Sequence, residues 1–446
     1  MVILGAGESG TGAALLAKSR GWDVFVSDAA EIKPAYADRL NAAGIVFESG
    51  GHTMDRILDT SLMVKSPGIP DKAPAVAAAK ARGIEVIDEI EFAFRYLKGK
   101  VIAITGTNGK TTTTLLTYHL LKSAGLSVAL AGNVGRSLAS QLAEGDHDWY
   151  VIEISSFQLD GTRTFRPETA ILTNITPDHL DRYDYQIGNY MESKLRLVAN
   201  MLPNGTFIHH GADPLTAKAL ENRPVRPRRL SVSLSDATAP VHADGSEMTW
   251  DMGGEVLCID QAETTLKGTH NILNTMMAVA AARLAGVAPG DIRAALRTFR
   301  NAPHRLEPVG TIRGVEFIND SKATNVDSVV YALGSFDRPL IWIAGGIDKG
   351  NDYGLIRDAV ASKVRSLVCL GKDNRKLVEA FTGVVADIAE TQDVRELVRM
   401  ALDRAERGDV VLLSPACASF DLFRNYEDRG DRFRAAVQEL KTEMGE

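Results

Sequence analysis

The sequence has few cysteines and no long run of basic residues. Its 446 residues include only Cys258, Cys369 and Cys417, which are widely separated and form no Cys-x-x-Cys pair. Three scattered cysteines argue against a disulfide framework and against a metal–thiolate site, and they favour reduced thiols in a cytosolic compartment. The net charge of −7, without basic runs, argues against nucleic acid and against a membrane surface as partners.

Long hydrophobic runs are lacking as well. No apolar stretch approaches the length that spans a membrane, and Met1–Leu4 runs directly into glycine without a basic region or an extended apolar core. We therefore expect no signal peptide and a cytoplasmic location. Long-period repeats and low-complexity segments are also absent. The length suggests about three domains, and the composition is that of a globular protein with enough apolar residues for several cores.

The most informative stretch that is present runs from Val101 to Thr113. Four apolar residues predict a buried strand, and a glycine-containing turn then leads into a helix. A strand, turn and helix in this order can surround an anion with backbone N–H groups and a helix N-terminus. Lys110 can then reach the β- and γ-phosphates, and Thr111 can place its hydroxyl on Mg²⁺. Ile104 replaces the first glycine of the usual loop, so this is a shorter variant. We predict a nucleoside triphosphate site; an ordinary strand–turn–helix corner with a surface lysine is the alternative.

A second glycine-rich turn, Gly5–Gly10, follows the strand predicted at Val2–Leu4 and precedes a helix. Asp28 stands at the end of the next predicted strand. This spacing with a downstream acid is typical of dinucleotide-binding turns, but a uridine or adenine diphosphate would fit it equally. Further βα units predict one small α/β domain ending near Arg95, in which residues 66–69 form either a binding loop or a plain loop.

Three polar residues of the middle region occupy informative positions. Glu153 lies in an apolar, β-branched run, where a carboxylate is costly unless it meets a cation such as Mg²⁺ or a salt-bridge partner. His179 follows the strand predicted over 170–175, at the end where ligand sites gather, although an ordinary loop histidine would also fit. Lys194 lies on an amphipathic helix predicted over 190–200, and that segment alone favours a solvated surface lysine.

The last half of the sequence predicts a β-element and a second site. Residues 230–266 alternate in short β-like runs, which predicts a small β-element packed on the central domain. The following helix carries Asn271 and Asn274 on one face, where they could contact a base edge or cap the first turn. Further on, polar clusters follow four predicted strands. Because open α/β sheets bind ligands at such strand ends, we predict a site of lysines and hydroxyls suited to a carboxylate substrate, at 319–325, 345–350, 371–373 and 414–421.

Taken together and in this order, the motifs resemble those of the Mur ligase family along essentially the whole chain. The residues that carry the resemblance are Thr105–Thr111, Glu153, Asp178-His179, Lys194, His270-Asn271, His304-Arg305, Asn319–Asn325 and Ser414–Ser419. The resemblance implies an α/β chain of three domains. These are an N-terminal Rossmann-like domain for a UDP-linked substrate at 1–95, a central P-loop ATPase-like domain with a small β-element at 96–299, and a C-terminal Rossmann-like domain for an amino acid at 300–446.

The resemblance further implies an ATP-dependent amide ligase of peptidoglycan precursor synthesis. Within the family, residues 151–158, 319–325 and 414–420 with Asn425 favour the reaction that joins D-glutamate to UDP-N-acetylmuramoyl-L-alanine. The terminal carboxylate of that substrate would attack the γ-phosphate of ATP, and the amine of D-glutamate would then displace phosphate from the acyl phosphate. Because a carboxylate and a triphosphate repel each other, cations must screen them.

Residue roles follow from the same resemblance. Catalysis would depend on Lys110, Glu153, His179 and Lys194. Two Mg²⁺ ions would be held, one by Thr111 and Glu153 and the other by His179 and a CO₂-derived carbamate on Lys194. ATP would contact Gly106, Thr107, Asn108, Gly109, Lys110, Thr111 and Thr112, with Asn271 on the adenine side and Arg305 and Asp320 near phosphate and ribose. The UDP-linked substrate would contact Ser9, Asp28, Gly68 and Asn133. D-glutamate would contact Lys322, Thr324, Lys349 and Ser419, with Tyr426 near its side chain.

Three other interpretations each fit part of the sequence. The nearest is another ligase of the same superfamily, adding L-alanine, a diamino acid, or glutamate to folate as folylpolyglutamate-type enzymes do. An NAD-dependent oxidoreductase is suggested only by Gly5–Gly10 with Asp28. A nucleotide-gated binding protein without ligase chemistry is the third. We expect a monomer, because one chain carries all parts of the site, and we expect the three domains to close on their ligands.

Overall fold

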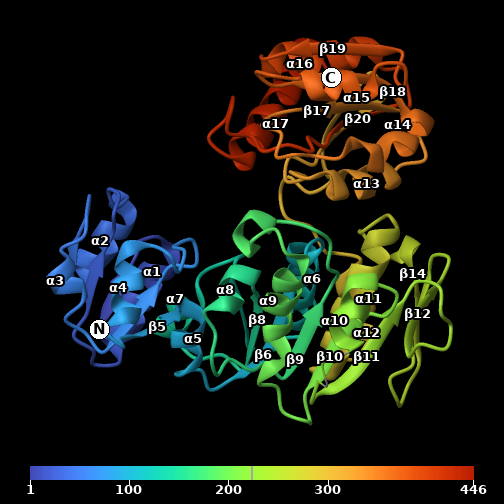
Figure 1. The fold of residues 1–446 in the computed structure, drawn as a ribbon. Helices are drawn as coiled ribbons and strands as arrows, with labels where there is room; N and C mark the ends of the chain where they lie inside the picture. Colours follow the sequence, from blue (N-terminus) through green and yellow to red (C-terminus); the bar gives the residue numbers. More distant parts are fainter. Residues whose placement is uncertain (222, 224) are drawn as a thin grey trace. The chain divides into compact units, whose positions relative to one another are not determined.

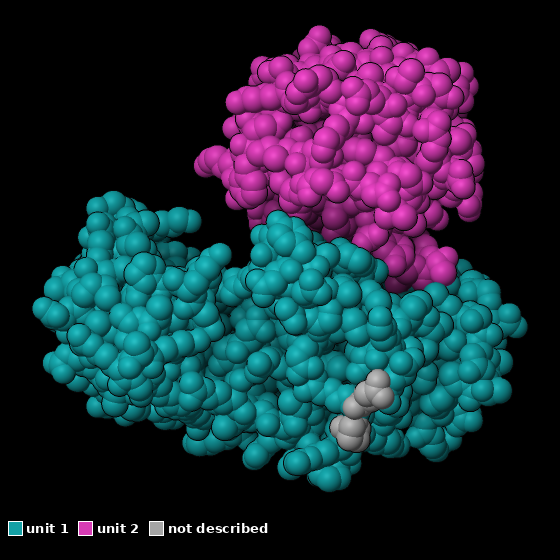
Figure 2. Space-filling model, viewed as in Figure 1, with its two compact units in different colours: residues 1–265, 272–299 teal, residues 266–271, 300–446 magenta. Residues whose placement is uncertain are grey.

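The computed structural model describes residues 1–221, 223 and 225–446 and builds them around three sheets (Figure 1). The described residues divide into two compact units, 1–265 with 272–299 and 266–271 with 300–446 (Figure 2). The domain boundaries predicted at 95/96 and 299/300 stay predictions. Among the described residues, no helix is both long and apolar enough to cross a membrane.

The first sheet is five-stranded and parallel. Its strands are β1 (Val2–Leu4), β2 (Phe25–Ser27), β3 (Val46–Glu48), β4 (Leu62–Lys65) and β5 (Glu85–Asp88), in the order β3-β2-β1-β4-β5. Parallel neighbours need crossover connections that cover both faces of a sheet. The helices that follow these strands are α1 (Glu8–Ser19), α2 (Pro34–Ala42), α3 (Met54–Ile57), α4 (Pro74–Ala81) and α5 (Glu89–Phe94). The Gly5–Gly10 turn therefore lies at the carboxyl edge of the central strand.

The second sheet has nine strands and carries the phosphate loop. Its strands are β6 (Lys100–Thr105), β7 (Val128–Gly132), β8 (Trp149–Glu153), β9 (Thr169–Leu172), β10 (Thr206–His210), β11 (Arg228–Ser233), β12 (Val241–Asp244), β13 (Glu247–Trp250) and β14 (Leu257–Asp260). Their order is β14-β13-β12-β11-β10-β9-β6-β8-β7. The helical segments are α6 (Lys110–Ser123), α7 (Leu138–Glu144), α8 (Ser156–Asp160), η1 (Leu180–Tyr183), α9 (Ile187–Ala199), α10 (Pro214–Glu221), η2 (Gln261–Glu263), α11 (Thr269–Leu284) and α12 (Pro289–Leu296). Strand β6 lies between β8 and β9, so the polar ends of three strands meet beside the loop.

The β-element at 230–266 differs from the expectation that it packs on the domain. It continues the second sheet edge to edge: β11 pairs in parallel with β10 and β12 in parallel with β11, and β13 and β14 then add antiparallel strands. This arrangement pairs the backbone groups that β10 would otherwise expose at a sheet edge. The extension is fixed to helix α11 by Trp250, which is buried and donates its indole N–H to the carbonyl of Met276 at 2.9 Å.

The third sheet has six strands, in the order β15-β16-β20-β17-β18-β19, and only β15 runs antiparallel to its neighbour. The strands are β15 (Glu307–Ile312), β16 (Val315–Asn319), β17 (Leu340–Ala344), β18 (Val364–Leu370), β19 (Asp387–Thr391) and β20 (Val410–Leu413). The helical segments are α13 (Val326–Gly334), η3 (Tyr353–Ile356), α14 (Arg357–Lys363), α15 (Arg375–Phe381), α16 (Val394–Arg404) and α17 (Tyr426–Glu443). Because β16, β20 and β17 are parallel neighbours, the loops that follow them meet at one edge.

Candidate active site

The phosphate loop lies between β6 and α6, as the sequence predicts. Gly106 has φ +150°, and a Cβ there would lie 1.8 Å from the hydroxyl of Thr173, so only glycine fits. The ammonium group of Lys110 donates to the carbonyls of Gly106 and Thr107 at 3.0 and 2.9 Å. Thr111 and Thr112, in the first turn of α6, are buried. The loop thus carries a lysine and two hydroxyls at a helix N-terminus, the arrangement that binds anions.

Asn174, which the sequence analysis gave no role, holds this loop in place. Its side-chain oxygen accepts from the backbone N–H of Asn108 at 2.9 Å, and its amide donates back to the carbonyl of Asn108 at 3.1 Å. The backbone N–H of Thr107 donates to the backbone carbonyl of Asn174. The hydroxyl of Thr173 donates to the backbone carbonyl of Asn108 at 2.6 Å. The available signal was a polar pair, Thr173-Asn174, directly after a strand that neighbours β6.

Glu153 ends β8 beside the loop and has 1% of its surface exposed. One carboxylate oxygen accepts from the amide of Asn133 at 2.8 Å, and the other is buried without a hydrogen-bond partner. A buried carboxylate with an unused oxygen is costly unless a cation completes it, so Glu153 fits Mg²⁺. Asn133, expected to contact the UDP-linked substrate, lies here beside Glu153.

The protein has no metal site built from its acidic, histidine and cysteine side chains alone in the part of the chain that the structure describes: no cluster of three or more His, Cys, Asp or Glu side chains there is placed to hold a metal ion. The two sites expected from the sequence contain one such side chain each, Glu153 or His179. Their remaining ligands would have to come from a hydroxyl, a modified lysine and the phosphates of the nucleotide.

Lys194 is buried, with 2% of its surface exposed, so the interpretation as a solvated surface lysine is wrong. Its side-chain nitrogen donates to the carbonyl of Gly106 at 2.6 Å and lies 4.5 Å from the ring centroid of Tyr190. Burial, together with the nearby charge of Lys110, lowers the pKa of Lys194 well below its usual range. The sequence did hold a signal: Lys194 is spaced i+4 from Tyr190 and i+3 from Met191, on the apolar face of α9.

His179 lies in the loop between β9 and α9, with a positive φ of 52° and half of its side chain exposed. Its ring packs edge-on against Phe157 at 5.2 Å. The guanidinium of Arg182 also lies over the Phe157 ring, 3.9 Å from its centroid. Arg182 in addition donates to the carbonyl of Pro67 at 3.2 Å. Arg182 and Phe157, which had no assigned role, therefore connect the His179 loop to the loop that contains Gly68.

The remaining residues expected to contact the UDP-linked substrate lie at the carboxyl edge of the first sheet. The carboxylate of Asp28 accepts from the backbone N–H groups of Ala6 and Ala30 at 2.7 and 2.9 Å. It thereby closes the Gly5–Gly10 turn. Ser9 lies in the first turn of α1, and Gly68 lies in the loop after β4.

In the C-terminal unit, Asp320 directly follows β16. Its two oxygens accept from the backbone N–H of Leu306 at 3.2 Å and from the hydroxyl of Ser414 at 3.0 Å. Burial raises the pKa of Asp320 to about 7. Arg305 stands between two residues with positive φ, His304 at 64° and Leu306 at 44°, so the backbone on both sides of Arg305 has an uncommon conformation.

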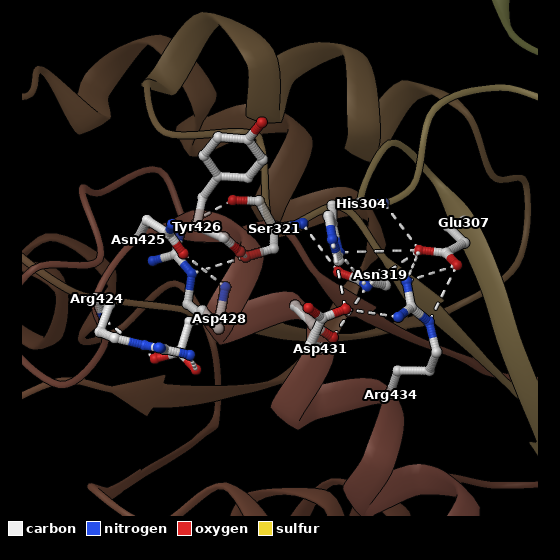
Figure 3. Close-up of polar contacts among 12 residues, drawn as sticks. His304, Glu307, Asn319, Ser321, Arg424, Asn425, Tyr426, Asp428, Asp431 and Arg434 are labelled. Carbon is white, nitrogen blue, oxygen red and sulfur yellow. Dashed lines mark hydrogen bonds and ion pairs between the residues drawn. The ribbon is translucent and has the colours of Figure 1, made fainter. Parts of the chain in front are cut away.

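His304 anchors that conformation (Figure 3). It is buried, with its Nδ1 3.0 Å from the amide of Asn319 and its Nε2 3.7 Å from the carboxylate of Asp431. Its ring lies edge-on to Tyr426 at 6.2 Å. Glu307 accepts from the backbone N–H of His304 at 2.8 Å and from the guanidinium of Arg434 at 2.9 Å, and the figure shows both contacts.

The residues expected to hold D-glutamate lie on loops of one sheet edge. Lys322 and Thr324 follow β16, Lys349 follows β17, Ser419 follows β20, and the Lys322 ammonium lies 5.2 Å from the Tyr426 ring. The loops are joined by Arg429 of α17, which is buried. Its guanidinium donates to the hydroxyl and carbonyl of Ser321 at 2.9 and 2.8 Å and to the carbonyls of Gly345 and Cys417. Sequence analysis missed this arginine because its helix is otherwise highly charged.

Three models of known protein families together match most of the chain. Residues 1–88 match the Mur ligase MurD-like N-terminal domain, 104–282 match the Mur ligase middle domain, and 304–417 match the Mur ligase glutamate ligase domain. The chain belongs to the Mur ligase family. The middle domain of Mur ligases implies that ATP binds the region that contains the phosphate loop.

Individual Mur ligases support this assignment. The chain is 50% identical to a UDP-N-acetylmuramoylalanine–D-glutamate ligase of Cytophaga hutchinsonii, with 99% of each chain covered, and 48% identical to that of Bacteroides fragilis over the same shares. Among solved structures, UDP-N-acetylmuramate–alanine ligase MurC of Thermotoga maritima aligns with a TM-score of 0.64 over 99% of both chains. A pseudomurein peptide ligase type C of Methanothermus fervidus gives the same TM-score over 99% of this chain and 100% of that one. Both structures are 19% identical in sequence, so they show the shared fold alone.

Proposed function

We propose that this chain is an ATP-dependent ligase that adds D-glutamate to UDP-N-acetylmuramoyl-L-alanine in peptidoglycan precursor synthesis. The observation that carries the proposal is 50% identity over the full length to a UDP-N-acetylmuramoylalanine–D-glutamate ligase. The matching MurD-like N-terminal domain supports the same member of the family.

In the first half-reaction the alanyl carboxylate attacks the γ-phosphate of ATP. We assign the triphosphate to the loop Gly106–Thr112, with Lys110 compensating its charge; Asn271, Arg305 and Asp320 would contact the rest of the nucleotide. Thr111 and Glu153 would hold one Mg²⁺, and His179 with modified Lys194 a second. When bound, these ions would reduce the repulsion between carboxylate and triphosphate. The buried, partner-free oxygen of Glu153 supports the first site.

Modification of Lys194 would join its nitrogen to the carbon of CO₂ and release one proton. Only a neutral amine carries the lone pair for this step, and burial favours the neutral form of Lys194. The product is a carboxylate-like group, which can hold Mg²⁺ where an ammonium cannot.

In the second half-reaction the amine of D-glutamate attacks the acyl phosphate and phosphate leaves. We assign the carboxylates of D-glutamate to Lys322 and Lys349, with Thr324 and Ser419 donating hydrogen bonds and Tyr426 near the side chain. Ser9, Asp28, Gly68 and Asn133 are assigned to the UDP-linked substrate. The monomeric state, the cytoplasmic location and closure of the domains on ligands stay predictions.

The test is phosphate release from ATP in the presence of UDP-N-acetylmuramoyl-L-alanine, with amino acids added one at a time. We expect release that depends on D-glutamate and not on L-glutamate. Release with another amino acid would keep the chemistry and assign the chain to a sister ligase. Release indifferent to every amino acid would contradict the proposed ligase reaction.

A further inference from the structure

The loop that carries Lys349 depends on a carboxylate for its shape. After β17 the chain passes Gly346, whose φ is +124° and whose Cβ would lie 2.1 Å from the carbonyl of Ala418. Ile347 and Ala418 then exchange two backbone hydrogen bonds, at 2.8 and 3.1 Å. Beyond that point the turn closes on the side chain of Asp348, which accepts from the backbone N–H groups of Gly350 and Asn351 at 2.7 and 3.3 Å.

The Asp348 carboxylate is also tied to two other elements. Its Oδ1 accepts from the ammonium group of Lys376 on α15 at 2.9 Å, and its Oδ2 accepts from the hydroxyl of Tyr353 at 2.9 Å. Asp348 is largely buried, with 16% of its side chain exposed. Burial opposes its ionisation, but the hydrogen bonds from Lys376, Gly350 and Tyr353 lower the pKa of Asp348 below its usual value.

Tyr353 extends the connection to the loop that carries Ser419. Its hydroxyl lies 3.3 Å from the thiol of Cys417 and accepts from the amide of Asn351 at 3.2 Å. The same amide donates to the carbonyl of Ala416 at 3.1 Å. The Asp348 carboxylate therefore fixes the β17 loop against the β20 loop, and those loops carry Lys349 and Ser419.

We propose that Asp348, neutralised by Lys376, is a positioning residue that presents Lys349 to a carboxylate of the incoming amino acid. The inference rests on the proposed function, in which Lys349 binds that carboxylate. Asp348 is adjacent to Lys349 in the chain, so an uncompensated charge there would repel an anionic substrate. The Lys376 ammonium removes that repulsion while the two backbone hydrogen bonds keep the turn closed. Residues Asp348 and Lys376 line one cavity of about 520 Å³, so the pair is accessible to solvent on one side.

Two substitutions separate shape from charge. Asp348→Ala removes the acceptor that closes the turn, and we expect the KM for D-glutamate to rise about tenfold, with kcat and the KM values for ATP and the UDP-linked substrate unchanged. Lys376→Met leaves the turn intact but removes the cation that compensates the negative charge of Asp348. Because 64% of the Lys376 side chain is exposed and the charge is screened, we expect only about a threefold rise in the KM for D-glutamate.

A double-mutant cycle gives the decisive readout. Asp348→Asn keeps an oxygen for the turn and removes the charge, so adding Lys376→Met to it should cause no further rise in KM for D-glutamate. Asp352→Asn and Arg375→Met are the matched controls, since Asp352 caps the next turn of the same loop and Arg375 lines the same cavity but pairs with Asp373. Both controls should keep the wild-type KM.

Three results would overturn the positioning role. They are a wild-type KM for D-glutamate in Asp348→Ala, an equal effect of Lys376→Met with and without Asp348→Asn, and a parallel change in all three KM values. The wild-type protein is assayed first with D-glutamate. If it shows no D-glutamate-dependent phosphate release, the proposed function itself fails; if it does and the variants match it, only the role of Asp348 fails.

Discussion

The side-chain nitrogen of Lys194 lies 2.6 Å from the backbone carbonyl oxygen of Gly106. This bond joins helix α9 to the phosphate loop and holds a lysine, out of water, close to a second lysine at position 110. The neutral amine is favoured there. Lys194 is thus suited to react with CO₂ rather than to compensate phosphate charge as Lys110 does.

Lys194→Ala tests this assignment. We expect activity to fall by about 100-fold or more, because a ligand for Mg²⁺ is lost, and short carboxylic acids should partly restore it by occupying the vacated space. The exposed Lys122 on α6 supplies the control: Lys122→Ala should be fully active and indifferent to added acids. Undiminished activity of Lys194→Ala would refute the role.

Glu153→Gln tests the cation site in β8. The change keeps an oxygen that can accept from Asn133 but removes the charge, so we expect half-maximal activity to need much more Mg²⁺ and thermal stability to hold or rise. Glu91→Gln is the contrast. Glu91 is equally buried, but its carboxylate accepts from the backbone of residues 163–165, so this variant should lose stability and keep the wild-type Mg²⁺ requirement. An unaltered Mg²⁺ titration in Glu153→Gln would count against the site.

Asn174→Ala tests whether the phosphate loop depends on its neighbour. The variant loses both side-chain hydrogen bonds to Asn108, at a cost of about 1–3 kcal/mol in unfolding free energy. A looser loop should raise the KM for ATP about tenfold and leave the KM for D-glutamate unchanged. Steady-state kinetics with each substrate varied in turn would decide, and an unchanged KM for ATP would show that the loop holds its shape alone.

Glu89→Gln tests a pH dependence of stability. Burial raises the pKa of Glu89 to about 8, and the neighbouring carboxylates of Asp88 and Glu8 add to the rise. In the unfolded chain this group ionises near pH 4.5, so folding takes up a proton between these values. The native state is therefore penalised increasingly as pH rises from 4.5 to about 8, and the penalty is constant above that.

Removing this titration should make Glu89→Gln gain stability over the wild type with rising pH, by an amount on the order of 1–3 kcal/mol at high pH. Thermal unfolding of both proteins at roughly pH 5 and roughly pH 8.5 measures the difference in Tm between them. At roughly pH 5 the native wild type carries little of the penalty from ionising Glu89, and at roughly pH 8.5 it carries nearly all of it. An equal difference in Tm at the two pH values would contradict the assignment.

The sequence predicted those features that local pattern determines. Buried parallel strands read as apolar runs, and Glu153 stood out because such a run has no reason to contain a carboxylate. Contacts between distant segments were not predictable in this way. Asn174 bonds to a residue 66 positions away, and Arg429 joins three loops that come together only in the folded sheet. The pairing of β11 with β10 was missed for the same reason, since a strand's pattern does not name its partner.

The most direct test of the proposed reaction uses UDP-N-acetylmuramoyl-L-alanine labelled with ¹⁸O in its alanyl carboxylate, together with ATP and D-glutamate. If the carboxylate attacks the γ-phosphate, the phosphate released carries one labelled oxygen and the UDP-linked product gains one glutamyl group, both measured by mass spectrometry. Phosphate without label, or a UDP-linked substrate of unchanged mass, would contradict the account.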